Sequence, residues 1–262
     1  MDLKNARILL TGASGGLGQE LARQLNDAGA ALLLAGRDQG RLAALTASLG
    51  TGAASVCADL DRPAGVVALA GAAREFGINV LINNAGVGAF GLFENQDWST
   101  IEGVLATNLE APVRLTHALL PWLKAQPQAA IVNIGSTFGS LPFPGFVAYS
   151  TAKAGLRGFS QALRRELADS LVSVVHIAPR AIDTPLNSDA VKALNRALKN
   201  HSDSAEDVAR QIVRALRRGD GESHFGFPER LFAWINGFAP ALIDRGLAGK
   251  LAIIKQHSSS SS

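Results

Sequence analysis

The sequence has very little cysteine and no long apolar run. Cys57 is the only cysteine among 262 residues, so an intrachain disulfide is excluded and nothing indicates an oxidising compartment. We interpret Cys57 as a small buried side chain of a strand. The first apolar run, Ile8–Leu10, is too short for the core of a signal peptide. No stretch reaches the ~18 uninterrupted apolar residues of a membrane span, so we expect a soluble, cytoplasmic protein.

The excess of one sign of charge over the other is also small. The chain carries 25 Lys and Arg against 22 Asp and Glu, a formal net charge of +3. The basic residues are scattered, so we expect no nucleic-acid partner. The five histidines lack the spacing of metal ligands, and we expect no metal site. There is one tyrosine, Tyr149, so a phenolic acid or base has only one candidate.

Short apolar runs alternate with longer helical stretches. Continuous apolar runs are typical of parallel strands that are covered on both faces. The strands are expected at Arg7–Leu10, Ala31–Ala35, Ala53–Cys57, Val80–Ile82, Ala129–Ile134, Leu171–Ile177 and His224–Phe227. The helices between them are expected at Gly16–Ala28, from Asp38 to Leu49, Pro63–Phe76, Asn108–Lys124, Ala148–Ala168 and Ala205–Arg217. The alternation predicts one α/β domain over residues 1–257, a Rossmann-like doubly wound parallel sheet of about seven strands.

The region 187–257 does not follow this alternation. A helix is expected at Leu186–Asn200, and an apolar stretch runs over 228–255. We interpret the region as substrate-side helices and a helical cover or subunit contact. The alternative is a membrane-surface helix, which the interrupting glycines and proline disfavour. The serine run 258–262 is expected to be a disordered tail.

The first predicted strand runs into a glycine-rich turn, Thr11–Gly18. Glycines let a ligand approach the backbone closely, and the free amides at the start of the next helix favour an anion such as a pyrophosphate. The spacing differs from the GxGxxG fingerprint, but the turn lies between the first strand and the first helix, where a dinucleotide would bind. The predicted contacts are Gly12, Ser14, Gly16, Leu17 and Gly18.

The residues at the end of the second strand indicate which dinucleotide the protein binds. Gly36 stands where an acid would otherwise bind the ribose 2′-hydroxyl, and Arg37 follows it. A small residue leaves room for a 2′-phosphate, which a guanidinium can pair with bidentately. We therefore predict NADP(H) in preference to NAD(H). Asp38 is interpreted as a helix cap, and its alternative role is to hold a ribose hydroxyl.

Four further motifs follow in a fixed order. They are Asn83–Gly86 after the fourth strand, Asn108 at the start of the fifth helix, Ser136 after the fifth strand, and Tyr149–Lys153 at the start of the sixth helix. With the glycine turn, this pattern resembles the classical short-chain dehydrogenase/reductase (SDR) family from about residue 7 to 184. The turn also satisfies the spacing of the extended branch, but the chain length and the Asn-Asn-Ala-Gly motif favour the classical one.

The resemblance implies further cofactor contacts and an assembly. The additional contacts that it implies are Asp59, Leu60, Asn84, Ala85, Gly86, Tyr149, Lys153, Pro179, Ile182 and Thr184. The loop 179–184 departs from the family at Arg180, where glycine is usual, which puts the shape of the substrate pocket in question. The resemblance also implies a homodimer or homotetramer, formed through the helices expected to begin at Asn108 and Ala148.

The same residues indicate a reaction. Tyr149 and Lys153 are four residues apart and share a helix face. A nearby ammonium lowers a phenol pKa, so Tyr149 would be the acid in reduction and the base in oxidation. Ser136 would stabilise charge on the substrate oxygen. By the resemblance, Asn108 would hold a water that links Lys153 to solvent. The four are the predicted catalytic residues.

The sequence thus predicts an NADP(H)-dependent oxidoreductase that acts on a small-molecule carbonyl or secondary alcohol. The apolar loop 138–147, with Phe90, Leu92 and Phe93, indicates a hydrophobic substrate. The alternative is a dinucleotide-binding sensor or scaffold of the same fold without turnover. The presence of all four catalytic candidates argues against it.

Overall fold

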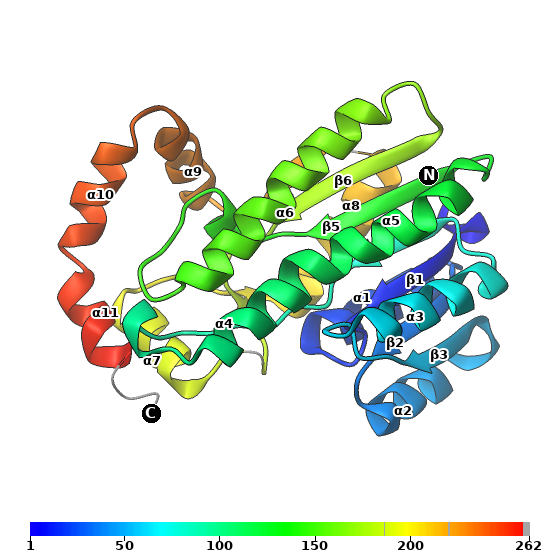
Figure 1. Cartoon of the computed structure of the whole chain (residues 1–262), viewed down its shortest axis with the longest axis horizontal. Coiled ribbons are helices and arrows are strands. Elements are labelled where there is room, and N and C mark those ends of the chain that lie inside the picture. The colour runs from blue at the N-terminus through cyan, green and yellow to red at the C-terminus, as the bar shows by residue number, and fades with distance from the viewer. Residues whose placement is uncertain (186, 220, 259–262) are drawn as a thin grey trace.

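The computed structural model describes residues 1–185, 187–219 and 221–258. Leu186 of the predicted helix and residues 259–262 of the predicted tail lie outside this part. The described chain forms a seven-stranded sheet in which every neighbouring pair is parallel (Figure 1). Across the sheet the strands are β3 (Ala53–Cys57), β2 (Ala31–Gly36), β1 (Arg7–Thr11), β4 (Val80–Asn83), β5 (Ala129–Ile134), β6 (Val172–Ala178) and β9 (Glu222–His224). The predicted fold class is confirmed.

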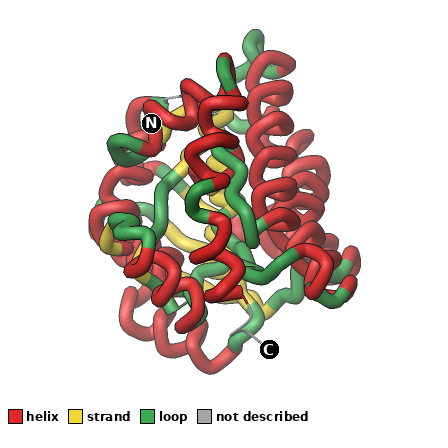
Figure 2. Tube along the Cα trace, turned by 90° about the vertical axis from the view of Figure 1, so that its left-hand side faces the viewer, coloured by secondary structure: helices red, strands yellow, loops and turns green. Residues whose placement is uncertain are grey.

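Helices cover both faces of the sheet, so most of its strands lie inside the molecule (Figure 2), whereas the edge strands β3 and β9 are partly exposed. One face packs against α1 (Gly16–Asp27), α2 (Gln39–Leu49) and α8 (Ala205–Arg218). The other face packs against α3 (Pro63–Phe76), α5 (Ala111–Lys124) and α6 (Val147–Glu166). The short 3₁₀ helices are η1 (Leu3–Asn5), η2 (Gly50–Gly52), η3 (Phe93–Asn95) and η5 (Thr137–Gly139).

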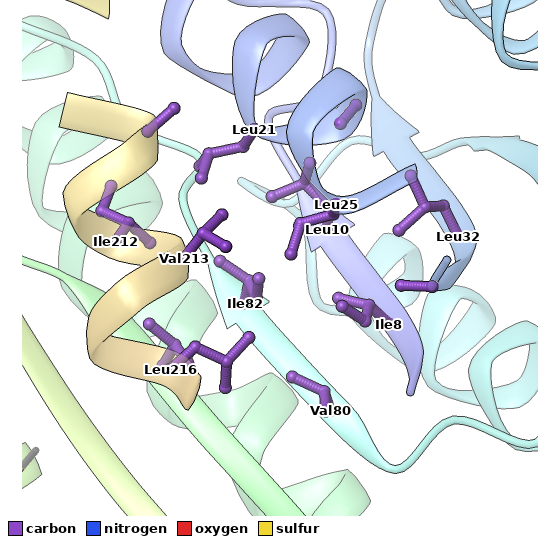
Figure 3. Packing of buried hydrophobic residues seen from close by; sticks show 14 of the residues in the cluster. Ile8, Leu10, Leu21, Leu25, Leu32, Val80, Ile82, Ile212, Val213 and Leu216 are labelled. Carbon is purple, nitrogen blue, oxygen red and sulfur yellow. The ribbon is translucent and has the colours of Figure 1, made fainter. Parts of the chain in front are cut away.

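The two covered faces explain the continuous apolar runs. In β1, Ile8 and Leu10 point to the face of α1 and α8, whereas Leu9 points to the opposite face. Figure 3 shows Ile8 and Leu10 among side chains from α1, α8 and the neighbouring strands. Each buried aliphatic side chain of this size contributes about 1.5–3 kcal/mol relative to exposure. A polar residue at these strand positions would therefore be costly on either face.

The interpretation of Cys57 is half right. Cys57 lies in a strand as predicted, but it is exposed because β3 is the edge strand of the sheet. The seventh strand, β9, begins two residues earlier than predicted. A separate short parallel pair, β7 (Ile182–Asp183) with β8 (Asp203–Ser204), was not predicted. The predicted helix after residue 186 is shorter and forms α7 (Asp189–Ala197).

The prediction that Asn108 opens a helix is wrong. The helix begins ten residues earlier as α4 (Trp98–Leu105), continues through a π-helical turn (Ala106–Glu110) and becomes α5. Asn108 lies inside the π-helical turn. The polar side chain of Asn108 suggested a cap, but the flanking apolar residues are buried in one continuous helix.

The C-terminal region forms three short helices, α9 (Glu229–Phe238), α10 (Pro240–Ala248) and α11 (Leu251–Ser258). They form an arc along one end of the molecule (Figure 1). α9 and α10 contain no buried residue, and α11 packs against α7. In the described part of the chain, no helix has both the length and the apolar character needed to cross a membrane.

Candidate active site

A cavity of about 1820 Å³ lies along the carboxyl ends of the strands. It includes the point between β1 and β4 where the chain order reverses, which is where ligands bind in open α/β sheets. All residues predicted to bind the cofactor or to catalyse line this cavity, except Asp59. Those that line it are Gly12, Ser14, Gly16, Leu17, Gly18, Arg37, Leu60, Asn84, Ala85, Gly86, Asn108, Ser136, Tyr149, Lys153, Pro179, Ile182 and Thr184.

The glycine turn is built for close backbone approach. Gly12 has a φ of +64°, and a Cβ on it would lie 2.7 Å from the Cα of Ala85. A Cβ on Gly18 would lie 2.1 Å from the carbonyl oxygen of Gly12. α1 begins at Gly16 without a side-chain cap, so its first amides are free for an anion. The turn therefore fits a pyrophosphate.

The turn is fixed to the neighbouring strand end by Thr11 and Asn84. The Thr11 hydroxyl accepts the backbone N–H groups of Asn84 and Ala85, both at 3.0 Å. The Asn84 amide in turn donates to the carbonyl oxygens of Thr11 at 3.0 Å and Gly12 at 3.2 Å. The Asn84 side chain therefore links the ends of β1 and β4 at the point where the strand order reverses.

Two arginines, one directly after β2 and one in the first turn of α2, reach the cavity. Arg37 and Arg41 both line it, and Arg41 was not predicted although it follows Arg37 by one helical turn. A Cβ on Gly36 would lie 2.9 Å from the Ser14 hydroxyl, so an acidic side chain has no room there unless Ser14 moves. The Asp38 side chain accepts the Arg41 N–H at 2.9 Å, which confirms its role as a helix cap.

Asp59 does not line the cavity. Its carboxylate accepts the N–H of Asp61 at 3.2 Å and faces Arg62 at 3.5 Å. Asp61 lies in the cavity wall instead, together with Leu60. The Asp61 carboxylate accepts a hydrogen bond from Thr107 and faces Arg37 at 3.5 Å. Sequence spacing could not choose between two acids separated by one turn residue.

Lys153 is buried beside Tyr149 and the end of β5. Its Nζ donates to the carbonyl oxygen of Ile134 at 2.9 Å and lies 5.7 Å from the centre of the Tyr149 ring. Burial lowers the pKa of Lys153 to about 8. The ammonium is therefore mostly charged at pH 7, but it is a more willing proton donor than a surface lysine.

The expected lowering of the Tyr149 pKa is wrong. Burial raises the pKa of Tyr149, and the hydrogen bond with Ser136 only partly opposes the rise. The phenolate is the charged form, so removal from water disfavours it. The sequence spacing of Tyr149 and Lys153 indicated their proximity, but it could not show that Lys153 is buried and Tyr149 partly buried.

Asn108 has a free acceptor in a buried position. Its amide donates to the carbonyl oxygens of Val87 and Val104, both at 2.9 Å. Its Oδ1 is buried and has no hydrogen-bond partner among the described residues. A Cβ on Gly86 would lie 2.8 Å from this oxygen and 3.8 Å from Nζ of Lys153. The π-helical turn thus aims the acceptor at the same space as Lys153.

Aromatic rings line the other side of Tyr149. Phe138 and Phe143 stack with ring centres 5.3 Å apart, and Phe146 lies 5.1 Å from Phe138 and 5.0 Å from Phe90. These four rings and Leu141 line the cavity. The opposite apolar wall comes from Phe232, Leu242, Ile243 and Leu247 of α9 and α10. Other predicted pocket residues, Leu92, Phe93, Pro142, Pro144 and Val147, are not part of the lining.

Arg180 is held by acids of two other segments. Its guanidinium donates to both oxygens of Asp203, at 2.8 and 2.6 Å, and faces Glu229 at 3.5 Å. The hydrogen bonds and the charge of Asp203 raise the pKa of the Arg180 guanidinium. The loop after β6 therefore accommodates the charge of Arg180, because Asp203 in β8 and Glu229 at the start of α9 compensate it.

The comparisons with known proteins agree with this geometry. The model of the short chain dehydrogenase family matches residues 6–195. A Bacillus subtilis protein, "Uncharacterized oxidoreductase DltE", is 32% identical over 231 residues, which cover 85% of this chain and 88% of that protein. A short-chain dehydrogenase/reductase from Burkholderia phymatum in complex with NAD has a TM-score of 0.84 at 25% identity, covering 92% of this chain and 96% of that one.

A short-chain dehydrogenase from Sphingobium yanoikuyae in complex with NADPH is similar at a TM-score of 0.79 and 30% identity. That comparison covers 91% of this chain and 95% of the other. The chain belongs to the short-chain dehydrogenase/reductase family, and it is an oxidoreductase.

Proposed function

We propose that the protein is an NADP(H)-dependent oxidoreductase that interconverts an apolar carbonyl compound and its secondary alcohol. The observation that carries the proposal is the convergence of Tyr149, Lys153 and Ser136 in the cavity that the glycine turn also lines. A phenol, an ammonium and a hydroxyl around one point are what carbonyl reduction requires besides the hydride. Homologous structures are bound to NAD or NADPH, which supports a nicotinamide cofactor here.

The cofactor would lie along the floor of the cavity. The amides at the start of α1 would hold its pyrophosphate, and Arg37 and Arg41 would pair with a 2′-phosphate beside Gly36. Leu60 would pack near the adenine, and Lys153 would bind the nicotinamide ribose. When bound, the cofactor supplies the hydride. Asn84–Gly86 and the loop 179–184 would position its nicotinamide end.

The chain itself would supply the proton and the geometry. Tyr149 would donate a proton to the carbonyl oxygen, to which Ser136 would donate a hydrogen bond. Because burial raises its pKa, Tyr149 holds this proton throughout neutral pH. Lys153 and the free Oδ1 of Asn108 would carry a replacement proton inward through water. The rings of Phe138, Phe143 and Phe146 would exclude water from the reacting carbonyl and favour an apolar substrate.

Replacement of Tyr149 by phenylalanine tests the proposal. The ring, its packing and α6 are retained, so NADPH binding should stay almost unchanged. Ketone reduction, followed as NADPH absorbance over a panel of ketones, should fall about a hundred- to ten-thousandfold, the usual contribution of an acid–base group. Thr151→Val is the matched control, because it removes another hydroxyl from the exposed side of the same helix. Turnover of Tyr149→Phe within about threefold of wild type would exclude Tyr149 as the proton donor.

The same panel tests the non-catalytic alternative. A sensor or scaffold would bind NADPH, seen as a change in its fluorescence, without oxidising it in the presence of any ketone. The convergent side chains of Tyr149 and Lys153 have no evident use in such a protein. Turnover that depends on Tyr149 therefore rejects the alternative.

A further inference from the structure

The C-terminal arc carries many exposed apolar side chains. Eight of the thirteen large hydrophobic side chains exposed in the described chain lie between residues 227 and 253. We call these eight the arc patch: Phe227, Leu231, Phe232, Trp234, Phe238, Leu242, Leu251 and Ile253. Leu231, Trp234 and Phe238 share one face of α9, and the last two rings are 4.9 Å apart. Isolated exposed hydrophobics are ordinary, but a cluster of this kind marks an interaction site.

The charges on the arc are predominantly basic. Between residues 228 and 258 there are four basic residues, Arg230, Arg245, Lys250 and Lys255, and two acids, Glu229 and Asp244. Glu229 faces Arg180 within the protein and Lys250 lines the cavity, so Arg230 and Arg245 against Asp244 are the charges of α9 and α10 that lie outside the cavity lining. Apolar and aromatic side chains beside basic ones are typical of helices that lie in the headgroup region of anionic membranes.

The arc patch is continuous with the cavity. Phe232 and Leu242 are 42% and 58% exposed, and both also line the cavity. Ile243 and Leu247 of α10 form the lining beside them. Phe227, Phe232 and Leu242 therefore belong both to the arc patch and to the cavity lining, whereas the other five residues of the patch lie outside the lining. Figure 2 views the molecule from the end on which this arc lies.

We propose that α9, α10 and α11 dock on the surface of an anionic lipid bilayer, and that apolar substrates reach the cavity from the bilayer past Phe232 and Leu242. The route for substrate rests on the proposed function, whereas the docking does not. The glycines and proline that disfavoured a membrane helix in the sequence divide the segment into three short helices without removing their apolar side. A second copy of the chain is a poorer occupant, because a two-fold contact would oppose the two sets of basic residues.

Flotation of the full-length protein with vesicles tests the docking. Vesicles of phosphatidylcholine with about a third phosphatidylglycerol should bind the protein at least tenfold more tightly than phosphatidylcholine alone, because basic residues near anionic lipid strengthen binding. Trp234→Ser/Phe238→Ser should weaken binding at least tenfold, since neither side chain could then insert. Trp98→Ser on α4 is the matched control, because Trp98 is 68% exposed against 63% for Trp234.

The charge contribution has its own pair of variants. Arg230→Glu/Arg245→Glu should remove the preference for anionic vesicles, whereas Arg217→Glu/Arg218→Glu at the end of α8 should retain it. Equal binding to both kinds of vesicle, or no binding, would overturn the proposal. So would a change of Trp234→Ser/Phe238→Ser from oligomer to monomer in light scattering, because the patch would then be a subunit contact.

Turnover of a water-soluble ketone separates this proposal from the proposed function. Trp234 and Phe238 do not line the cavity, so their double variant should reduce such a ketone at the wild-type rate. Reduction of a long-chain ketone embedded in vesicles should fall together with vesicle binding. Wild-type protein that reduces the soluble ketone but does not bind the vesicles would contradict only the docking, and wild-type protein that binds the vesicles but reduces no ketone would contradict only the proposed function.

Discussion

Burial shifts the pKa values of Tyr149 and Lys153 in opposite directions. Burial raises the pKa of the phenol and lowers that of the ammonium to about 8, because each charged form loses water. At neutral pH the phenol is therefore protonated, which suits a proton donor.

Arg37, which follows β2, and Arg41 in α2 should determine which cofactor binds more tightly. We expect wild-type protein to bind NADPH more tightly than NADH, and Arg37→Ala and Arg41→Ala each to weaken NADPH about tenfold, the value of one charge-assisted contact. NADH binding should barely change. Fluorescence titration of both cofactors measures the ratio. Arg62→Ala, which removes an exposed arginine outside the cavity, is the control.

A wild-type preference for NADH would contradict this assignment. An unchanged NADPH to NADH ratio in both variants would show that neither arginine is its source. Asp61 opposes Arg37 at 3.5 Å, so Asp61→Asn should strengthen NADPH binding slightly if Arg37 pairs with the phosphate.

His176 should make the fold sensitive to mild acid. Its ring is fully buried, and burial, opposed by Glu222, lowers its pKa from 6.5 to about 4. Between pH 6.5 and 4 the unfolded chain binds a proton that the folded chain does not, so the free energy of unfolding falls as the pH falls. The loss approaches roughly 3 kcal/mol at pH 4, at about 1.4 kcal/mol per pH unit.

Urea unfolding at pH 7 and pH 4.5 measures this loss. His176→Leu should lose most of the difference between the two pH values, whereas His201→Leu, at an exposed position, should keep it. The pKa of Glu222 is lowered from 4.5 to about 2, so the stability it contributes is lost as the pH falls from 4.5 to about 2, mostly below this window. An equal pH difference in wild type and His176→Leu would contradict the assignment.

The substrate-side elements are joined by one cation. Arg180 links the loop after β6 to β8 through Asp203 and to α9 through Glu229. Arg180→Met would leave two carboxylates without their partner at a site where the side chains are 15–24% exposed. We expect a loss of about 2 kcal/mol, and a fall in Tm of roughly 4–8 °C for a domain of this size.

Calorimetry on a second variant separates the ion pair from simple packing. Arg180→Met/Asp203→Asn removes the stranded charge together with the guanidinium, so it should recover part of the lost Tm. A double variant that is no more stable than Arg180→Met would show that the unpaired carboxylate of Asp203 does not destabilise the Arg180→Met protein.

The assembly should be a dimer or a tetramer. We expect light scattering to give two or four times the 27.3 kDa of the chain. The contact is proposed to lie on α5 and α6, so Gly158→Arg on α6 should yield the monomer. A Cβ on Gly158 meets nothing within 4 Å in the protomer, and the same holds for Gly71 on α3. Gly71→Arg is therefore the matched control, and a monomeric wild type would contradict the assembly.

Local patterns predicted the sheet and most of the cavity lining. Strands such as β1 and β5 are apolar on both faces, and that property is visible in a short window of sequence. The glycine turn and the spacing of Tyr149 and Lys153 are local too, and their placement follows once the strands are parallel. The exposed edge position of Cys57 was missed, because a window of sequence does not say which strand has one neighbour.

The features that sequence reasoning missed depend on contacts between distant segments. Sequence alone determined that this chain is a doubly wound α/β protein, and it predicted the candidate catalytic residues that line one cavity. Tertiary structure decided that Tyr149 is desolvated, that Asp61 and not Asp59 faces Arg37, and that Arg180 is neutralised by β8 and α9. The reason is physical: a pKa, an ion pair and an exposed apolar surface depend on what the fold brings alongside a residue, and those neighbours are far away in the chain.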